Sequence, residues 1–422
     1  MAVPKSSGKY DTSRSMDRRT RSAHIHESIS LGAFLAGEWS DALARNGPRA
    51  AADASRLGLT PLTIEVEGDY WTLAVADNTL GPHSAEPVAA RVCIDLSAFD
   101  DLVSNRKTAM GLLVHQRVAG GDSAMALFNQ WDPVLRSVLD DWHVYAPGEI
   151  ALAAQDGTPL NVNQVFTLDD DRDLLAHFFS EAGFLLLKNV LTDAELTQLD
   201  GEFTTAVTAA EPGDGQSWWA QTGTGEDYSC RVLNFARKSP TLQRLMQDER
   251  LLSIGRILGD GHIPGDSFGE HFGDLSAEAL VKKVDSVQGL SCLPWHKDCE
   301  RGGHTLYCCG ITIGICLTPA DEAHGGLDVY AGSHRANVAS AQSRAGLDLP
   351  HVSLVAERGD VTVHLSCLQH RSTHPTTSER RVIYTGFTLP DQAATHVRSR
   401  QQLEHERGVI GDIAGAGKRS AQ

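Results

Sequence analysis

The first 150 residues combine helical and strand-like patterns of hydrophobic positions. Apolar residues over 26–47 recur at the three- and four-residue spacing of an amphipathic helix. Residues 62–76 alternate between apolar and polar positions on both sides of a Gly-Asp turn, which predicts a β-hairpin. A strand and a helix over 90–104, and a strongly amphipathic helix over 122–141, complete the pattern. This order predicts an α+β domain over residues 24–150.

A change of pattern marks the beginning of a second domain. Residues 147–159 are rich in proline and glycine and are read as the domain junction. The next segment reads as helix, strand and helix. Asp171 and the two aspartates before it can cap the first of these helices, and Gly183 can end it. Thr192 and Glu195 have the spacing of a capping box at the start of the second helix.

Short strands dominate the remainder of the chain, between Leu290 and Leu389. Runs of roughly 5–8 residues are separated by glycine-containing turns, as in a barrel or a sandwich. We therefore expect an α+β protein with two domains, at 24–150 and 151–395. Residues 1–23 are expected to form a disordered tail, and residues 396–422 a C-terminal tail.

Composition and charge narrow the range of partners. The 422 residues are 41% hydrophobic and 22% charged, which is ordinary for a globular protein. Since no apolar run reaches about 18 residues, no membrane span is expected. A formal charge of −17 disfavours nucleic acid and anionic membrane surfaces as partners, so any anionic substrate would need a local cationic pocket. The eight cysteines contain no C-x-x-C pair, so we expect reduced thiols, no structural zinc cage and a cytoplasmic location.

The candidate chemistry lies in the sequence LPWHKDC, which holds the single His-x-Asp of the chain, His296 and Asp298. Chance alone would produce about one such pair, so its surroundings must decide its meaning. Non-haem Fe(II) oxygenases bind iron through two histidines and one carboxylate on one face and leave the other positions open. A second histidine should come from a later strand, and His370 follows Asp298 by 72 positions.

Two choices stay open at this point. His364, within the strand, and His374, in the turn before a proline, compete with His370 as the second histidine ligand. Arg380 and Arg381 follow, and an arginine can bind a carboxylate through two parallel hydrogen bonds. Strand alternation sends these two arginines to opposite faces, so only one of them can point into a barrel.

Taken together, five segments resemble the phytanoyl-CoA dioxygenase family of Fe(II)/2-oxoglutarate oxygenases over about 163–390. They are EAGFLLLKNVLTDAEL, LPWHKDC, HGGLDVYAGSH, RGDVTVHLSCLQHRS and SERRVIY. The resemblance implies a double-stranded β-helix, which is a jelly-roll or cupin-like barrel, with flanking helices. It also implies that His296, Asp298 and His370 bind iron.

The same resemblance implies how the cosubstrate is held. The family's arginine for 2-oxoglutarate lies eleven positions after the second histidine, which is Arg381 here, and its helper serine is Ser372. The implied activity uses Fe(II), 2-oxoglutarate and O2, releases succinate and CO2, and hydroxylates a C–H bond. Related halogenases carry Gly or Ala in place of the carboxylate, so Asp298 implies oxygenation, with desaturation or cyclisation left open. One departure is Gly314, where the family often has tryptophan.

The N-terminal domain resembles the sterol-carrier-protein fold in YWTLAV, VCIDLSAFDDLVSNRKTAMGLLV and VAGGDSAMALF. That resemblance implies an apolar tunnel, and hence a lipid, steroid or terpenoid-like substrate in lipid catabolism or secondary metabolism. The domain could instead serve in packing or in pairing two copies of the chain. The alternative functions are a lipid- or sterol-binding protein with a non-catalytic oxygenase scaffold, and a zinc hydrolase with the same three ligands.

Overall fold

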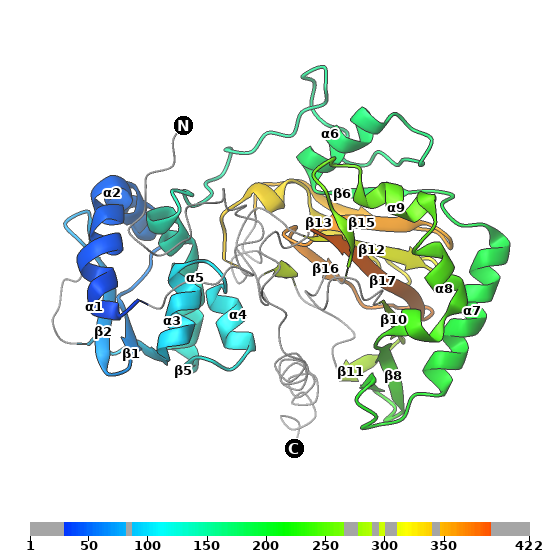
Figure 1. The fold of residues 1–422 in the computed structure, drawn as a ribbon, viewed down its shortest axis with the longest axis horizontal. Coiled ribbons are helices and arrows are strands. Elements are labelled where there is room, and N and C mark those ends of the chain that lie inside the picture. The colour runs from blue at the N-terminus through cyan, green and yellow to red at the C-terminus, as the bar shows by residue number, and fades with distance from the viewer. Residues whose placement is uncertain are drawn as a thin grey trace.

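The computed structural model shows two units joined by an extended segment (Figure 1). The tails expected at 1–23 and 396–422 lie outside the described residues. The structure describes residues 29–81, 87–265, 277–288, 295–299, 310–339 and 347–389.

The N-terminal unit packs helices against a mixed sheet. Its elements are α1 (Leu31–Phe34), a π-helical turn η2 (Leu35–Trp39), α2 (Ser40–Arg56), β1 (Leu62–Val66), β2 (Asp69–Ala76), β3 (Thr79–Gly81), β4 (Arg91–Ile94), α3 (Leu96–Val103), α4 (Ala109–Val114), β5 (Ala119–Gly120) and α5 (Asp122–Leu139). The strand order is β3-β2-β1-β4-β5, with β1 and β4 parallel. The predicted hairpin is confirmed, since β1 and β2 pair with Ile64 opposite Trp71.

Aromatic side chains fill the centre of this unit. The ring of Phe34 lies 5.4 Å from that of Trp71 and 5.2 Å from that of Phe99, in edge-to-face contacts. All three side chains are buried. The helical pattern predicted over 26–47 continues to Arg56, because the alanines beyond Pro48 pack into the same core.

The C-terminal unit is built from two antiparallel sheets with helices on the outside. Its elements are α6 (Arg172–Ala182), β6 (Phe184–Leu187), α7 (Asp193–Thr208), β7 (Ser217–Thr222), β8 (Asp227–Val232), η3 (Phe235–Lys238), α8 (Pro240–Leu245), α9 (Glu249–Gly255), β9 (Ile263–Gly265), β10 (Glu278–Lys282), β11 (Ser286–Gln288), β12 (Gly310–Cys316), β13 (Leu327–Tyr330), η5 (Ser333–Arg335), β14 (His351–Leu354), β15 (Val361–Leu365), β16 (His370–Ser372) and β17 (Arg380–Thr388). The larger sheet runs β11-β7-β8-β10-β17-β12-β15-β6, with β9 beside β17, and the smaller sheet runs β14-β13-β16. This architecture is compatible with a jelly-roll or cupin-like oxygenase fold.

The start of the C-terminal unit follows the sequence prediction closely. Asp171 caps α6, and Gly183 ends it at a φ of +82°, a conformation that favours glycine. The capping box of Thr192 and Glu195 begins α7. The strand between these helices, β6, is fully buried, as its unbroken apolar run predicts.

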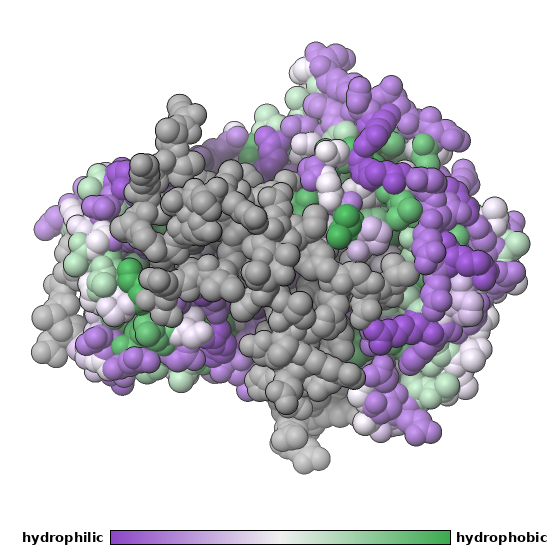
Figure 2. Space-filling view, in the orientation of Figure 1, coloured by the Kyte–Doolittle hydropathy of each residue, from purple (hydrophilic) through white to green (hydrophobic). Residues whose placement is uncertain are grey.

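The outer surface of this unit is polar. The surface over α7 and α8 is largely hydrophilic (Figure 2), in keeping with the net charge of −17. Within the described ranges, every helix is too short or too polar to span a lipid bilayer.

The two units meet next to the short segment that carries the His-x-Asp sequence. Asn337 donates side-chain hydrogen bonds to the carbonyls of Pro133 (2.9 Å) and Trp142 (2.8 Å) in the N-terminal unit. Lys297, between His296 and Asp298, is fully buried, and its Nζ donates to the carbonyl of Ala336 at 3.1 Å. The N-terminal unit therefore supports the chain segment that holds the candidate ligands.

Gly314 lies where three strands of the larger sheet come close together. It pairs with Thr362 of β15 on one side and with Tyr384 of β17 on the other. A Cβ atom at this position would lie 2.7 Å from Thr362 Oγ1 and 2.9 Å from Tyr384 Cε1. The ring of Tyr384 thus occupies the space beside Gly314, where the related family often places a tryptophan.

Replacing Gly314 with alanine should force Tyr384 or Thr362 to move. We expect Gly314→Ala to lower the free energy of unfolding by about 1–3 kcal/mol, the usual cost of overpacking a core. Gly201→Ala is the matched control, because Gly201 lies in α7 with no atom within 4 Å of an added Cβ. That change should raise stability by about 0.5–1 kcal/mol. Urea unfolding measures both, and equal stability of the two variants would contradict this account.

An ion-pair cluster connects the start of α7 with α9. Arg250 donates to Glu195 Oε1 at 2.7 Å and to Asp248 Oδ2 at 2.9 Å. These hydrogen bonds are the main reason that the pKa of Glu195 is lowered to about 2 and that of Asp248 to about 2. The carboxylates thus stabilise the fold above their unfolded-state pKa values, and the gain disappears as the pH falls through their folded values.

Removing Arg250 should make the free energy of unfolding depend less on pH at acid pH. Between pH 4.5 and pH 2, the wild type should lose on the order of 1 kcal/mol more than Arg250→Met, because solvent screens this partly exposed cluster. Urea unfolding at several pH values measures the difference. Arg256→Met serves as the control, since Arg256, at the end of α9, forms an ion pair with the exposed Glu249 and not with this cluster. A parallel pH profile for wild type and Arg250→Met would show that the cluster contributes nothing.

Candidate metal centre

The backbone brings the two histidines of the candidate site together. His296 N donates to His370 O, and His370 N donates to His296 O, both at 3.0 Å. The two residues therefore form a hydrogen-bonded antiparallel pair, whose side chains lie on the same side. Their ring centroids are 4.2 Å apart. Asp298, two positions after His296, returns to the same side by strand alternation.

Three ligand atoms converge at this point. Asp298 Oδ1 lies 3.4 Å from His296 Nε2 and 3.8 Å from His370 Nε2. His296, Asp298 and His370 form the metal-ligand group found among the described residues, with ligand atoms all within 4.8 Å of one another. Two imidazoles and one carboxylate on one side of an ion form the ligand set of the non-haem Fe(II) oxygenases.

The chemistry of these side chains fits a divalent metal. His370 Nδ1 donates to the carbonyl of Leu368 at 2.9 Å, because a carbonyl can only accept. The lone pair is therefore on Nε2, the nitrogen that faces Asp298. Burial and the neighbouring His296 hold the pKa of His370 well below its usual range, so this imidazole is neutral and able to bind metal. The side chain of Asp298 is only 5% exposed.

The two other candidate histidines are not members of the metal-ligand group. His374 is exposed, in the segment between β16 and β17. His364 lies in the middle of β15 and is buried, with its Nε2 3.6 Å from Asp298 Oδ2. It stays outside the three-residue group but borders it.

The expectation that Arg381 points inwards is wrong. Arg381 Nε donates to Glu379 at 2.7 Å, and Nη1 reaches Asp200 and Thr204 of α7, at 3.2 and 3.1 Å. This guanidinium therefore lies between the larger sheet and the outer helix, where it also lines a pocket of about 340 Å³. Since neighbouring residues of a strand face opposite ways, Arg380 points to the other side. Counting eleven positions from His370 thus selects the wrong face of β17.

Arg380 lies between the two sheets together with the predicted helper serine. It is 4% exposed, and its Nη1 donates to Ser372 Oγ at 3.2 Å and to the carbonyl of Gly325. Its Nη2 donates to Tyr384 Oη at 2.8 Å. Ser372 follows His370 on β16, so strand alternation puts both on one side. The structure thus brings Ser372 together with Arg380 and not with Arg381.

A second cation, which sequence reasoning did not assign to the site, shares this space. Lys282 pairs with Arg380 across β10 and β17, is 4% exposed, and donates through Nζ to Ser372 Oγ and to the carbonyl of Thr373. Lys283 turns outwards to Glu226. Strand alternation in EALVKKV could have indicated that one of these lysines faces inwards, but the pattern alone does not say which one.

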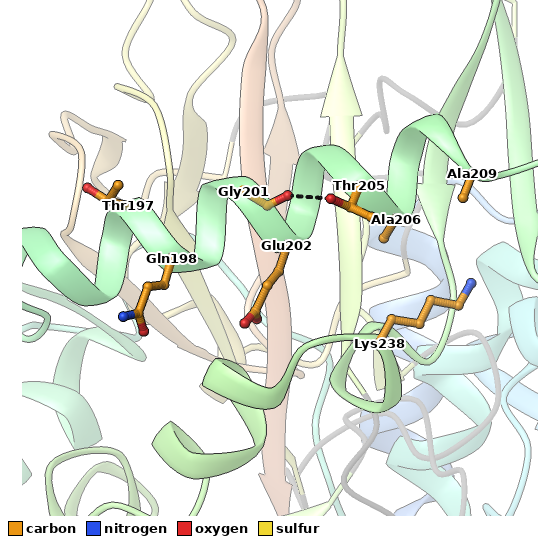
Figure 3. Close-up of a pocket in the computed structure, with 8 residues that line it drawn as sticks. All are labelled: Thr197, Gln198, Gly201, Glu202, Thr205, Ala206, Ala209 and Lys238. Atoms are coloured by element: carbon orange, nitrogen blue, oxygen red, sulfur yellow. Dashed lines mark hydrogen bonds between the residues drawn. The ribbon is translucent and has the colours of Figure 1, made fainter.

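A separate groove of about 730 Å³ lies along the outer side of α7 (Figure 3). Its lining includes Glu202 and Lys238, and Glu202 accepts hydrogen bonds from Thr241 and Ser239. These contacts hold α7 against α8 and account for the polar groups in the groove. The groove adds no member to the metal-ligand group.

Comparisons with known proteins agree with this chemistry. Residues 179–383 match the family model of phytanoyl-CoA dioxygenase (PhyH). None of the curated proteins compared with the chain matches it.

Three solved structures illustrate what the chain is similar to. AviO1 from Streptomyces viridochromogenes Tue57 is 24% identical, with 54% of this chain and 98% of that chain covered and a TM-score of 0.43. EctD from S. alaskensis with bound Fe is 20% identical, with 54% and 81% covered and a TM-score of 0.42. The non-heme alpha ketoglutarate dependent carbocyclase SnoK from nogalamycin biosynthesis is 19% identical, with 53% and 85% covered and a TM-score of 0.40.

The matched range covers most of the two antiparallel sheets and ends within β17. It includes His296, Asp298 and His370, and also Ser372 and Arg380. The cofactors of this family are Fe(II) and 2-oxoglutarate. Residues 179–383 are thus a phytanoyl-CoA dioxygenase domain, and the protein is an iron- and 2-oxoglutarate-dependent dioxygenase.

Proposed function

We propose that this dioxygenase hydroxylates an unactivated C–H bond of a small, largely apolar molecule, with Fe(II) held by His296, Asp298 and His370. The observation that carries the proposal is the reciprocal backbone pairing of His296 and His370, which puts two imidazole nitrogens beside one carboxylate oxygen. The carboxylate of Asp298 supports oxygenation over halogenation, since related halogenases lack it.

Each side chain has a distinct task in this proposal. Bound iron and 2-oxoglutarate would supply the oxidising power for attack on the C–H bond. The three side chains would bind the metal from one side, as in other non-haem Fe(II) oxygenases, and would leave its remaining positions to cosubstrate and O2. Arg380 replaces Arg381 as the partner of the far carboxylate of 2-oxoglutarate, and Ser372 orients that carboxylate beside it. Arg380 is buried and Ser372 is half-buried, and the low exposure of the guanidinium strengthens these contacts.

We also propose the finer architecture. The C-terminal unit, 151–395, would be a double-stranded β-helix with flanking helices, and the unit at 24–150 a sterol-carrier-like domain. The N-terminal resemblance supports a lipid, steroid or terpenoid-like substrate and a role in pairing two copies of the chain. Thiol cysteines such as Cys93 and Cys316 support a cytoplasmic location.

Loss of the carboxylate tests the metal centre directly. Asp298→Ala should weaken Fe(II) binding and 2-oxoglutarate turnover by at least roughly 100-fold, more than the loss of an outer partner usually costs. Anaerobic Fe(II) titration and succinate release measure the two effects. Asp321→Ala is the control, because Asp321 pairs with His324 in a loop outside the metal-ligand group. Turnover of Asp298→Ala at the wild-type rate would overturn the proposal.

The two neighbouring arginines form a matched pair for the cosubstrate. Arg380→Met should raise the KM for 2-oxoglutarate roughly 10- to 100-fold, because a buried hydrogen bond to a charged group contributes about 1.5–3 kcal/mol. Arg381→Met, on the other face of the same strand, should leave this KM within about twofold. Succinate release at a series of 2-oxoglutarate concentrations measures both values. The reverse pattern would restore Arg381 to the role that the family spacing implied.

A further inference from the structure

His364 is an unusual buried side chain. It is 1% exposed, and within the described part of the chain neither Nδ1 nor Nε2 has a hydrogen-bond partner. The half-buried His177 and the buried His262 each have a partner for one ring nitrogen. His177 Nε2 contacts the carbonyl of Ala153 at 2.8 Å, and His262 Nδ1 contacts Asp260 at 2.5 Å. An imidazole buried without a hydrogen bond is destabilising, so a purely structural role explains His364 poorly.

The strand positions of its neighbours give His364 a polar surrounding. On β15, Val361, Val363 and Leu365 pack into the main core. His364 points the other way, into the space between the sheets, and it pairs across the strands with Thr312 of β12. Its ring centroid lies 4.5 Å from that of His370, which belongs to the smaller sheet.

The two oxygens of Asp298 face different partners. Oδ1 is the oxygen near the two ligand nitrogens, at 3.4 Å from His296 Nε2 and 3.8 Å from His370 Nε2. Oδ2 lies 3.4 Å from Thr312 Oγ1 and 3.6 Å from His364 Nε2. One oxygen is thus directed to the metal position, and the other to a hydroxyl and an imidazole.

We propose that His364 is a positioning residue of the metal centre: its Nε2, 3.6 Å from Asp298 Oδ2 in this structure, donates a hydrogen bond to that oxygen in the metal-bound centre. This proposal rests on the proposed function, because it requires Asp298 Oδ1 to bind the metal. A carboxylate can only accept, so the proton of His364 is on Nε2. Together with Thr312, this imidazole holds Oδ2 away from the metal, so that Asp298 binds through one oxygen and a coordination position stays open. Carboxylates that bind a metal are commonly oriented by such outer hydrogen bonds.

The test measures metal binding and needs no turnover. Co(II) replaces Fe(II) as the probe, because its visible absorption reports the number and kind of ligands. We expect His364→Phe, which keeps the ring volume and removes the N–H group, to raise the Kd for Co(II) roughly 10- to 100-fold, the usual cost of losing such an outer partner. His364→Gln, whose amide N–H can still donate to Oδ2, should recover most of the affinity. His262→Phe, a buried histidine outside the metal-ligand group, should bind Co(II) as the wild type does.

Three results would overturn the proposed role of His364 and leave the proposed metal centre intact. They are wild-type affinity in His364→Phe, equal weakness of the Phe and Gln variants, and a Co(II) spectrum of the Phe variant that shows the loss of a nitrogen ligand. The last result would make His364 a ligand itself. If the wild type bound Co(II) no better than Asp298→Ala, the proposed centre would be wrong, and the role of His364 with it. Circular dichroism checks folding, and His364→Leu replaces the Phe variant if that protein does not fold.

Discussion

Two reciprocal backbone hydrogen bonds, between His296 and His370, are the interaction on which the site depends. They join a short segment in the middle of the C-terminal unit to β16, across 73 intervening positions of the chain. Backbone pairing of this kind fixes both the separation and the direction of the side chains. The position of Asp298 then follows from the alternation of the same segment.

The same alternation has a second consequence on the opposite side of the segment. Lys297 points away from the ligands and is buried against the carbonyl of Ala336, next to the contacts that Asn337 makes with the N-terminal unit. Burial raises the pKa of Asp132 in α5, while the nearby Arg136 and Lys297 act to lower it. The N-terminal unit thus contributes to the surroundings of the ligand segment, while among the described residues the metal-ligand group comes from the C-terminal unit alone.

Polar side chains line the space between the two sheets, while apolar side chains on the opposite face of the larger sheet pack against the helices. Arg380, Lys282 and Tyr384 gather around Ser372 at one place, and His364 stands beside Asp298 at another. Groups of this kind are costly to bury unless they bind one another or a ligand. Their concentration here supports the proposed site for an anionic cosubstrate and a metal.

The amino-acid sequence by itself determined the local elements, the two-unit order and the candidate ligands, because caps, turns and apolar periodicity act over a few neighbouring residues. Asp171, Gly183 and Thr192 took the helix-end positions that their side chains predict. Only the tertiary structure showed which way Arg380 and Arg381 face and where His364 lies. The side of a sheet to which a side chain points depends on how its strand pairs with distant strands. A shift of one residue along the strand reverses that side.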